Sequence, residues 1–412
     1  FREDCGLTFR DILAGVGVKQ GDSLGPVLFN VYFQACMEVL DARWTASKPS
    51  FYYDEDCVLT GRKASQEGTL EIDYCKSLYA DDGAFILTSR KDLDDHIPLL
   101  FTTLQDFGLK MHIGRGDERG KTEAMFFPAA SDIIRPNTSP SSATSHQVRP
   151  PRRKCDSCPS KTRAPSGRCS RCSRRTFDLV NPLNKAPILV DGGFVHFTDE
   201  FKYLGSIISE DLTDDADCNA RIRAAAGAFG ALRSRIFQER RVPTKVKRMA
   251  YQALVLNVLL FGCEAWSLSS YMLARLTSFH NRCIRSMLGY TLRLGRVIHK
   301  DTGNRTRHFV LRARLRLPTM RQILARRRLQ WLGHVFRMPS SRLPRRLLFS
   351  WLPIPRPVGR PRLTFGHSIR NDLDRAGLDT QNWPSLAANR SQWRALLDSR
   401  RMKTFSRVLA GT

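Results

Sequence analysis

Apolar residues of VLFNVYFQACMEVL, which ends at Leu40, recur at the spacing of a helix, and a turn-rich opening from Gly15, GVGVKQGDSLGP, leads into it. Pro26 stands near the first turn, where its missing amide hydrogen costs little. A second helical pattern covers Asp92–Phe107 and ends before Gly108, a residue suited to terminate a helix. The first third of the chain therefore contains two predicted helices.

Alternating apolar residues between and after these helices predict short strands. Two strands, Tyr74–Leu78 and Gly83–Leu87, flank a tight turn at residues 80–82. Met111–Ile113 and Glu123–Phe127 alternate in the same way. The predicted front of the molecule thus mixes helices with small antiparallel sheets.

The pattern breaks at Ser131, and up to Arg175 almost no large apolar residue occurs. A segment of this composition cannot fold by burial alone. Globular patterning returns at Ile188 with the strand-like sequences GGFVHF and FKYLGSII. An alanine-rich helix is predicted over Asp215–Phe237, with Asp214 and Asp215 at its start.

From Val242 onward the chain reads as successive arginine-rich helices, and a Pro/Arg break at Pro353–Arg362 precedes a last amphipathic unit ending near Leu409. The longest apolar stretch, Met249–Leu268, contains Gln, Asn and Glu and lies among arginines. It therefore predicts a core helix rather than a membrane span. No segment resembles a signal peptide, so we expect a nuclear or cytoplasmic protein that is not secreted.

Charge divides the 412 residues into two parts. The net charge is +27, yet residues 1–130 carry 21 acidic and 14 basic side chains, whereas residues 131–412 carry 18 and 52. The basic excess favours a polyanionic partner, most simply nucleic acid. Apolar residues make up 42% of the chain, which excludes a wholly disordered protein.

The sharpest local motif is LYADDGAFIL, at Leu78–Leu87. Asp81 and Asp82 stand at the tip of an apolar hairpin, where oxygen ligands favour Mg²⁺ and could serve two-metal nucleotidyl transfer. Asp-Gly between apolar strands is also an ordinary hairpin turn. The motif by itself leaves both interpretations open.

Three further blocks accompany this motif in a fixed order, and the four together resemble the reverse transcriptase of non-long-terminal-repeat (LINE-type) retrotransposons. The other blocks are GVKQGDSLGPVLFNVYF at Gly17–Phe33, FGLKMHI…KTEAMFF at Phe107–Phe127, and FKYLGSIIS at Phe201–Ser209. The resemblance extends through the thumb-like ARIRAAAGAFGALR and through VLNVLLFGCEAW, RRLQWLGHVFRMP and GRPRLTF…DLDRAGLD.

The resemblance implies a role for each matching residue. Asp81 and Asp82 match the metal-binding pair of the family, and Tyr79 would pack beneath the primer end. Lys121 matches the lysine that protonates the departing pyrophosphate, although GRGDERG precedes it. The remaining matches concern template, nucleotide and primer: Gln20 and Gly21 for the template and incoming nucleotide, and Tyr203, Leu204 and Gly205 for the hairpin that grips the primer. Ordinary alternatives are a turn at Gln20 and Gly21, a solvated Lys121, and core positions for Tyr203 and Leu204.

The family also places a third carboxylate on a strand before the Gln-Gly block, and only sixteen residues precede Gly17 here. Asp4 and Asp11 do not sit in an apolar strand of that kind. We therefore expect a truncated copy that lacks the fingers and the first palm strand and is inactive alone. Another chain could supply the missing part of the palm.

Four of the eleven cysteines form C-x2-C-x10-C-x2-C, namely Cys155, Cys158, Cys169 and Cys172. This spacing predicts a tetrahedral Zn²⁺ site whose metal supplies the folding energy of an otherwise coreless segment. It resembles the zinc ribbons of a Ran-binding nuclear-pore protein, but Arg153 and Thr162 replace the base-reading Trp and Asn of that family. The alternative is a disordered basic insertion. The seven other cysteines are expected to be buried and reduced.

The basic rear, residues 236–412, carries 35 Lys+Arg against 7 Asp+Glu. Arginines beside Trp331 and Trp393 suit phosphate contact, although core positions are expected for both tryptophans. Pro357–Arg362 faintly resembles a minor-groove hook. His280, Cys263 and Cys283 could form a second metal site, but core packing is the preferred interpretation.

The sequence thus predicts an α+β protein: a partial reverse-transcriptase palm, a zinc-knuckle insertion, a mostly α-helical thumb and a basic C-terminal region. The expected boundaries are 1–130, 131–185, 186–240, 241–350 and 351–412. The expected activity is RNA-directed DNA synthesis with Mg²⁺ from the 3′ hydroxyl of a nicked target, with an RNA template and a DNA primer as partners and no membrane. The alternative is a non-catalytic nucleic-acid-binding remnant that uses its zinc and arginine surfaces.

Overall fold

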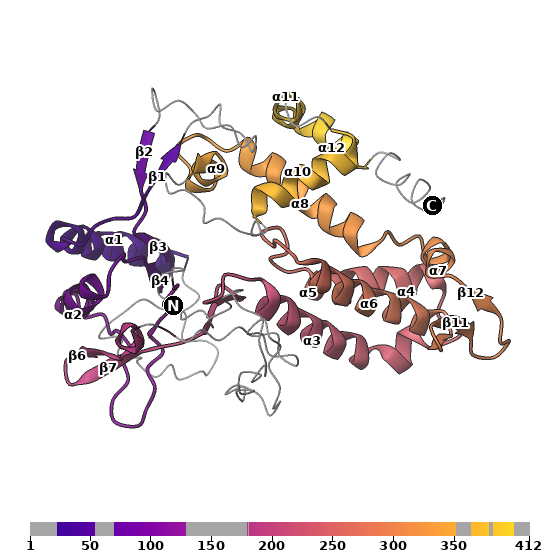
Figure 1. Cartoon of the computed structure of the whole chain (residues 1–412), viewed down its shortest axis with the longest axis horizontal. Helices are drawn as coiled ribbons and strands as arrows, with labels where there is room; N and C mark the ends of the chain where they lie inside the picture. The colour runs from indigo at the N-terminus through magenta and orange to yellow at the C-terminus, as the bar shows by residue number, and fades with distance from the viewer. Residues whose placement is uncertain are drawn as a thin grey trace, which may run out of the picture. The chain divides into compact units, whose positions relative to one another are not determined.

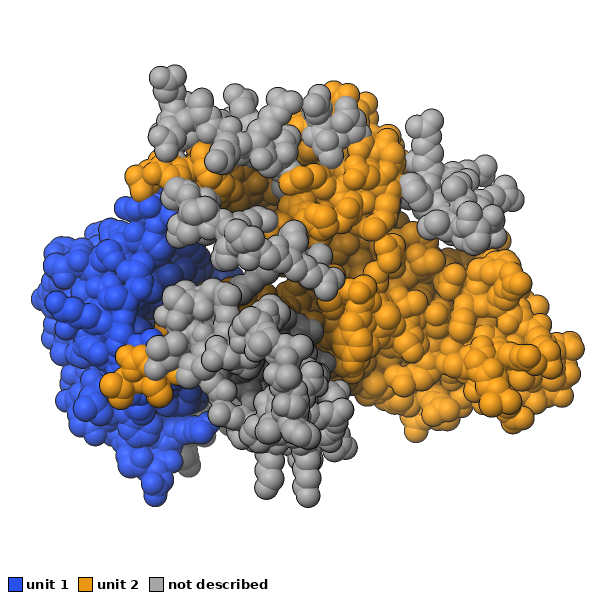
Figure 2. Space-filling view, in the orientation of Figure 1, with its two compact units in different colours: residues 1–51, 72–124, 184–197 blue, residues 52–71, 125–183, 198–412 orange. Residues whose placement is uncertain are grey.

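The computed structural model describes residues 23–53, 70–128, 179, 181–351, 364–378 and 382–398. Helices and strands alternate in the first half of the chain, and helices dominate the second (Figure 1). The chain divides into two compact units (Figure 2). The first unit comprises residues 1–51, 72–124 and 184–197, and the second comprises residues 52–71, 125–183 and 198–412.

Two helices and one hairpin form the first core of the first unit. Helix α1 (Gly25–Arg43) has Pro26 in its first turn, as predicted, and α2 (Arg90–Asp106) begins two residues earlier than expected because Ser89 caps it. The Ser89 hydroxyl accepts a hydrogen bond from the Asp92 amide at 3.0 Å. Gly108 follows α2 with φ +66°, which explains why the helix ends there.

The hairpin consists of β3 (Lys76–Tyr79) and β4 (Asp82–Phe85), and β2 (Leu70–Asp73), a strand that the sequence pattern did not predict, precedes it. Leu78 and Phe85 pack against Met37, Leu40 and other buried residues of α1 and α2. This apolar contact fixes the hairpin to the two helices.

A small sheet with the order β5-β7-β6 completes the first unit. Its strands are β5 (Glu123–Ala124), β6 (Ile188–Val190) and β7 (Gly193–Phe197). β6 and β7 form an antiparallel hairpin, whereas β5 runs parallel to β7. Ile188, Val190 and Val195 pack on Ile97 of α2. Residues more than sixty positions apart in sequence thereby share one core.

The predicted strand at Met111–Ile113 is wrong, and only Glu123–Ala124 of the predicted strand Glu123–Phe127 forms. Instead, single bridges join Gly114 to Phe194 and Arg115 to Glu118. Glycines replace side chains where the backbones cross, because a Cβ on Gly120 would lie 2.5 Å from the Gly114 nitrogen. The crossing is too tight for a regular ladder of side chains.

The second unit begins with the hairpin of β8 (Glu200–Tyr203) and β9 (Ser206–Ser209), followed by α3 (Asp215–Ala231). The predicted helix continues past α3 as a separate wide-turn segment at Arg233–Phe237. The next helical run comprises α4 (Thr244–Ala250), another wide-turn segment at Tyr251–Leu256, and α5 (Asn257–Leu259).

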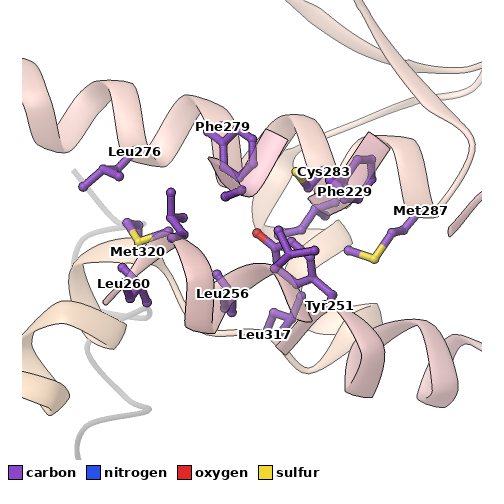
Figure 3. Close-up of a cluster of buried hydrophobic side chains, with 14 of the residues drawn as sticks. Phe229, Tyr251, Leu256, Leu260, Leu276, Phe279, Cys283, Met287, Leu317 and Met320 are labelled. Carbon is purple, nitrogen blue, oxygen red and sulfur yellow. The ribbon is translucent and has the colours of Figure 1, made fainter. Parts of the chain in front are cut away.

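These helices pack with α6 (Ser270–Met287) around the largest core of the chain (Figure 3). Phe229 and Phe237 stack with their ring centroids 4.5 Å apart, and Tyr251 meets both rings edge-on. Leu256, Leu260 and their neighbours in the long apolar stretch are buried in this core. The stretch is helical up to Leu259 and continues as a turn, so its interpretation as a core helix is confirmed for residues 249–259 only.

A three-stranded sheet interrupts the second half, which was wrongly predicted to be wholly helical. It contains β10 (Tyr290–Arg293), β11 (Arg296–His299) and β12 (Arg305–Thr306) in that order. Tyr290 and Val297 are buried in the core beside α6. The turn signal was present as Leu294-Gly295, but surrounding arginines masked the short apolar alternation.

The C-terminal part of the second unit gathers around α8 (Met320–Phe336), which follows α7 (His308–Leu315). Trp383 of α11 (Trp383–Ala388) and Trp393 of α12 (Arg390–Asp398) are buried with Leu329, Leu332 and residues of α10 (Phe365–Ala376). The core position predicted for Trp393 is confirmed, whereas Trp331 lies on the surface with 39% of its area exposed.

α9 (Leu343–Leu348) leads to β13 (Ser350–Trp351), which pairs antiparallel with Tyr52 and Tyr53 of β1 (Ser50–Tyr53). This pairing explains why Tyr52 and Tyr53 belong to the second unit. In the part of the chain that the structure describes, no helix combines the length and apolar character needed to cross a bilayer.

Candidate functional site

The Asp-Asp motif forms the tip of the β3–β4 hairpin. Tyr79 pairs with Asp82 and Leu78 with Gly83, so the turn consists of Ala80 and Asp81 alone. The strand alternation puts Leu78 and Phe85 on the face that packs on the helices and puts Tyr79 and Asp82 on the opposite face. The apolar side of the hairpin thus anchors it while its acidic tip is presented outward.

Both carboxylates lie in exposed residues, and Tyr79 is 65% exposed. The base of the hairpin is tied to α1 by an ion pair between Lys76 and Asp41. Among the described residues, no group of three or more His, Cys, Asp or Glu side chains is placed to hold a metal ion. The tip therefore offers two oxygen-donor side chains, which suits Mg²⁺ only when further oxygens come from a substrate or from elsewhere.

Ala80 adopts φ +51° in this turn, a conformation that alanine rarely occupies. Gly83 follows in β4, where a Cβ would lie 3.2 Å from the Phe85 ring and 3.4 Å from the Leu78 side chain. The local chain is thus strained at one position and closely packed at another, and this fixes the direction in which Asp81 and Asp82 leave the backbone.

Lys121 follows the loop formed by GRGDERG, and this loop closes on itself. Gly114 and Gly120 are buried at its neck, while residues 115–119 are exposed. The Lys121 amide donates to His112 Nδ1 at 3.2 Å, and the Thr122 amide donates to the His112 carbonyl at 3.0 Å. The two ends of the loop, at His112 and at Lys121 and Thr122, are therefore adjacent. The Lys121 side chain is exposed in the first unit, and no contact with Asp81 or Asp82 is recorded among the described side chains.

Tyr203, Leu204 and Gly205 form the end of the β8–β9 hairpin in the second unit. Tyr203 pairs with Ser206, and the turn residues Leu204 and Gly205 both have positive φ, +47° and +85°. The alternative core position is wrong for Leu204, which is 44% exposed, and Tyr203 is partly exposed. The three matched residues thus lie at one hairpin tip.

Arg221 of α3 holds this tip. Its guanidinium donates to the Gly205 carbonyl and lies 4.3 Å from the centroid of the Phe261 ring. It also pairs with Asp217 one turn earlier, at 3.5 Å. A side chain on Gly205 would press on Phe261 at 3.3 Å, and one on Gly262 would lie 2.8 Å from the Ser206 hydroxyl. The hairpin is therefore fixed on the helix and on the turn after α5.

Asp217 of α3, which the sequence interpretation missed, connects this helix to β9 and to the segment after α5. It is 3% exposed and accepts hydrogen bonds from the Ile207 amide at 3.2 Å and from Trp266 Nε1 at 2.9 Å. The sequence signal for this buried acceptor was an aspartate in the first turn of an alanine-rich helix. Acidic residues at this position usually stabilise the helix dipole, so the pattern did not indicate a buried hydrogen-bond acceptor.

Asp214 lies beside this network, at the start of α3. Its Oδ2 accepts from the Ser267 amide at 2.6 Å. Burial raises the pKa of Asp214 to about 6, despite that hydrogen bond, and the neighbouring carboxylates of Asp217, Asp215 and Asp211 raise it further. The folded protein therefore disfavours the ionised form of Asp214.

Other predicted ligand sets have different outcomes. His280 is fully buried, and its ring nitrogens bond to the Tyr251 hydroxyl at 2.9 Å and the Pro318 carbonyl at 3.1 Å. All three side chains, those of His280, Cys263 and Cys283, are buried, so the preferred core packing is confirmed. Burial lowers the pKa of His280 to about 4 and raises those of Cys263 and Cys283 to about 12.

Of the other single cysteines, Cys36 and Cys218 are buried and Cys75 is partly exposed. The remaining predictions lie outside the described residues: Gln20 and Gly21, Cys5 and Cys57, the zinc ligands Cys155, Cys158, Cys169 and Cys172, and the Pro/Arg break.

Neither a protein-family model nor a solved structure matches the chain. The chain is 26% identical over 206 residues to an uncharacterized transposon-derived protein of Caenorhabditis elegans. The match covers 48% of this chain and 70% of that protein. The similarity indicates an origin in a transposable element.

Proposed function

We propose that the chain derives from the reverse transcriptase of a LINE-type retrotransposon, whose substrates are an RNA template and a DNA primer, and that it is inactive alone. The observation that supports the proposal most is the exposed β3–β4 tip, where Asp81 and Asp82 are adjacent and the opposite face of the hairpin is anchored. A transposon-derived relative and the four sequence blocks agree with this activity.

In this proposal Asp81 and Asp82 would hold Mg²⁺, with phosphate oxygens of the substrate as further ligands. Bound Mg²⁺ would stabilise the charge that develops during nucleotidyl transfer. By the family resemblance, Tyr79 would support the primer end and Lys121 would donate a proton to the leaving group. Gln20 and Gly21, outside the described residues, would contact template and nucleotide. Tyr203, Leu204 and Gly205 grip the primer backbone, and Arg221 and Asp217 keep that hairpin in position.

The described residues contribute two carboxylates to this site, fewer than two-metal catalysis in the family uses. We therefore expect the purified chain to show no primer extension on an RNA template with Mg²⁺. Extension that Asp81→Ala abolishes would contradict this expectation and would mean that Asp4, Asp11 or a second chain completes the site.

A test of the metal pair does not depend on turnover. Fe²⁺ can replace Mg²⁺ and, with ascorbate and peroxide, cleaves the backbone next to its binding site. With a template–primer present, we expect cleavage near residues 79–83 that Asp81→Asn combined with Asp82→Asn removes. Asp73→Asn, a change at an exposed carboxylate of β2, is the control and should keep the cleavage. Cleavage elsewhere, or unchanged cleavage in the double variant, would overturn the proposed site.

The alternative function is nucleic-acid binding without catalysis, and the arginine surface of the second unit favours it. Residues 236–412 carry 35 cations against 7 carboxylates, so most of these cations have no anionic side chain to pair with. If six or more phosphates are contacted, affinity for duplex DNA should fall on the order of a thousandfold between 50 and 200 mM salt. Fluorescence titrations of the full chain with random DNA and RNA measure this slope. A shallow slope with a strong sequence ranking would contradict backbone binding.

A further inference from the structure

The turn of the β10–β11 hairpin contains a leucine that neither the backbone conformation nor packing favours. Leu294 and Gly295 both have positive φ, +47° and +72°, as a two-residue hairpin turn of this hand requires. Asn or Gly is favoured at the first of these positions, and a leucine there is strained. Leu294 is nevertheless 101% exposed, so burial offsets none of that cost.

The tip projects into open space. A Cβ added to Gly295 would meet no atom within 4 Å, whereas at the equivalent Gly205 of the β8–β9 hairpin it would meet Phe261. Both hairpins thus end in Leu-Gly with the same backbone signs, but only the first tip rests on its own unit. The second tip is free to enter a partner.

The solvent face of the sheet carries three arginines. Arg293 lies directly opposite Arg296, and Arg305 lies opposite Ile298 on the same face, because Tyr290 and Val297 occupy the other face and are buried. Like charges directly opposite each other in a sheet are destabilising. All three arginines are exposed, and no ion pair of theirs is recorded among the described residues.

The neighbouring charges do not balance this face. Lys300 and Arg307 are also exposed within the same segment. Asp301 is the single carboxylate between Gly289 and Arg307, and it pairs with Arg240 at 2.9 Å. An external polyanion is the partner whose binding would relieve the repulsion between Arg293 and Arg296.

We propose that this hairpin binds duplex nucleic acid, with Arg293, Arg296 and Arg305 on phosphates and Leu294 as a wedge against the base pairs. Apolar side chains at the ends of basic arms are used in this way by proteins that bind the minor groove and unstack a base step. A leucine held outward in a strained turn is pre-organised for insertion. The inference rests on the proposed nucleic-acid function and assigns it a particular contact site.

The arginine part is tested on the full chain with a triple variant, Arg293→Gln, Arg296→Gln and Arg305→Gln. The matched control changes three other exposed arginines, Arg233, Arg235 and Arg342, to Gln. Each lost phosphate contact lowers the slope of log K against log salt by about 0.9 on duplex DNA. We expect the hairpin variant to lose two to three such contacts and at least tenfold in affinity at 100 mM salt, clearly more than the control. Equal losses in the two variants would overturn the assignment.

The wedge is tested with Leu294→Asn, which places the favoured residue in the turn and should leave the fold intact or more stable. Binding of the wild-type chain to a duplex containing 2-aminopurine should raise the fluorescence as the base unstacks. The Asn variant should bind with less than half of that rise, and an unchanged rise would overturn the wedge.

Competition by polyglutamate as strong as that of duplex at equal charge would instead assign the arginine face to acidic proteins. If the wild-type chain binds no nucleic acid at all, the proposed function fails as well. If the wild-type chain binds and the hairpin variants bind equally well, this inference alone fails.

Discussion

At the scale of single residues, the candidate sites combine positive φ at non-glycine residues with buried acids. Ala80, Leu204 and Leu294 each adopt positive φ at a hairpin tip. Asp214 and Asp217 each accept a hydrogen bond from the turn after α5. Each of these local features has a free-energy cost that a single substitution can measure.

Ala80→Gly should raise the free energy of unfolding by about 0.5–1 kcal/mol, because glycine adopts positive φ without the steric cost that alanine pays. Urea denaturation measures the change. Ala84→Gly is the control, since Ala84 lies in β4 opposite Ser77 and glycine weakens a strand. The two variants should shift stability in opposite directions, and a loss of stability in both would contradict the strain at the tip.

Asp214→Asn should stabilise the protein at pH 7 and flatten its pH dependence. Because the pKa of Asp214 is raised to about 6 in the folded protein, the folded state binds a proton that the unfolded state does not bind between about pH 4 and 6. Stability from this residue therefore falls as pH rises through that window. The amide can still accept from Ser267, and the gain at pH 7 should be about 1–3 kcal/mol. Urea melts from pH 4.5 to 7.5 measure it. Asp374→Asn, at an exposed carboxylate, should keep the wild-type profile.

At the scale of elements, helix α8 shows how one sequence motif serves packing. Arg328 of RRLQWLGHVFRMP forms a buried ion pair with Asp372 of α10 at 2.7 Å. Gly333 lies under the indole of Trp393, whose Nε1 donates to the Leu329 carbonyl at 3.0 Å. A motif that reads as a basic surface therefore joins three helices.

Gly333→Ala should destabilise the protein by about 1–3 kcal/mol although alanine is the better helix former, because its Cβ would lie 2.3 Å from Trp393 Nε1. Thermal or urea unfolding of the full chain checks this. Gly227→Ala in α3 is the matched control, since a Cβ there meets nothing within 4 Å. The control should gain about 0.5–1 kcal/mol from helix propensity. A gain at both positions would show that the indole can move aside.

Local periodicity predicted α1, α2, the start of α3 and the hairpin at Asp81, whereas the hairpin at Leu204 was expected only from the family resemblance. It failed for Met111–Ile113, where glycine-to-glycine crossings replace strand pairing, and for β10–β12, whose arginines hide the apolar alternation. It also missed Asp217 and Arg221. Their importance arises from contacts with Trp266 and Gly205, and a helical pattern does not predict contacts across elements.

At the scale of the whole molecule, charge separates the candidate catalytic hairpin from the arginine-rich surfaces. Residues 1–130 are net acidic, and the rest of the chain carries 52 basic and 18 acidic side chains. Phosphates would be attracted to the second part and repelled by the first, so a cation at Asp81 and Asp82 is needed for a phosphate to approach them.

The purified chain should contain one tightly bound zinc ion, held by Cys155, Cys158, Cys169 and Cys172. Four thiolates at this spacing suit tetrahedral Zn²⁺, and the surrounding composition offers no apolar core that would replace it. Elemental analysis of the wild type and of Cys169→Ser decides the matter. Cys75→Ser, at a partly exposed single cysteine, should keep the zinc. Equal zinc in all three proteins, or none, would contradict the ligand assignment.

The parallel pairing of Glu123–Ala124 with His196–Phe197 has a consequence for biosynthesis. The core beneath α2 needs Ile188, Val190 and Val195, which the ribosome adds about ninety residues after the helix itself. During translation, the unit that carries Asp81 and Asp82 must therefore wait with an open apolar surface until the intervening cysteine-rich segment has emerged. Helix α2, on which the acidic hairpin packs, is thus made early, but its second core forms only after residues 188–195 have been added.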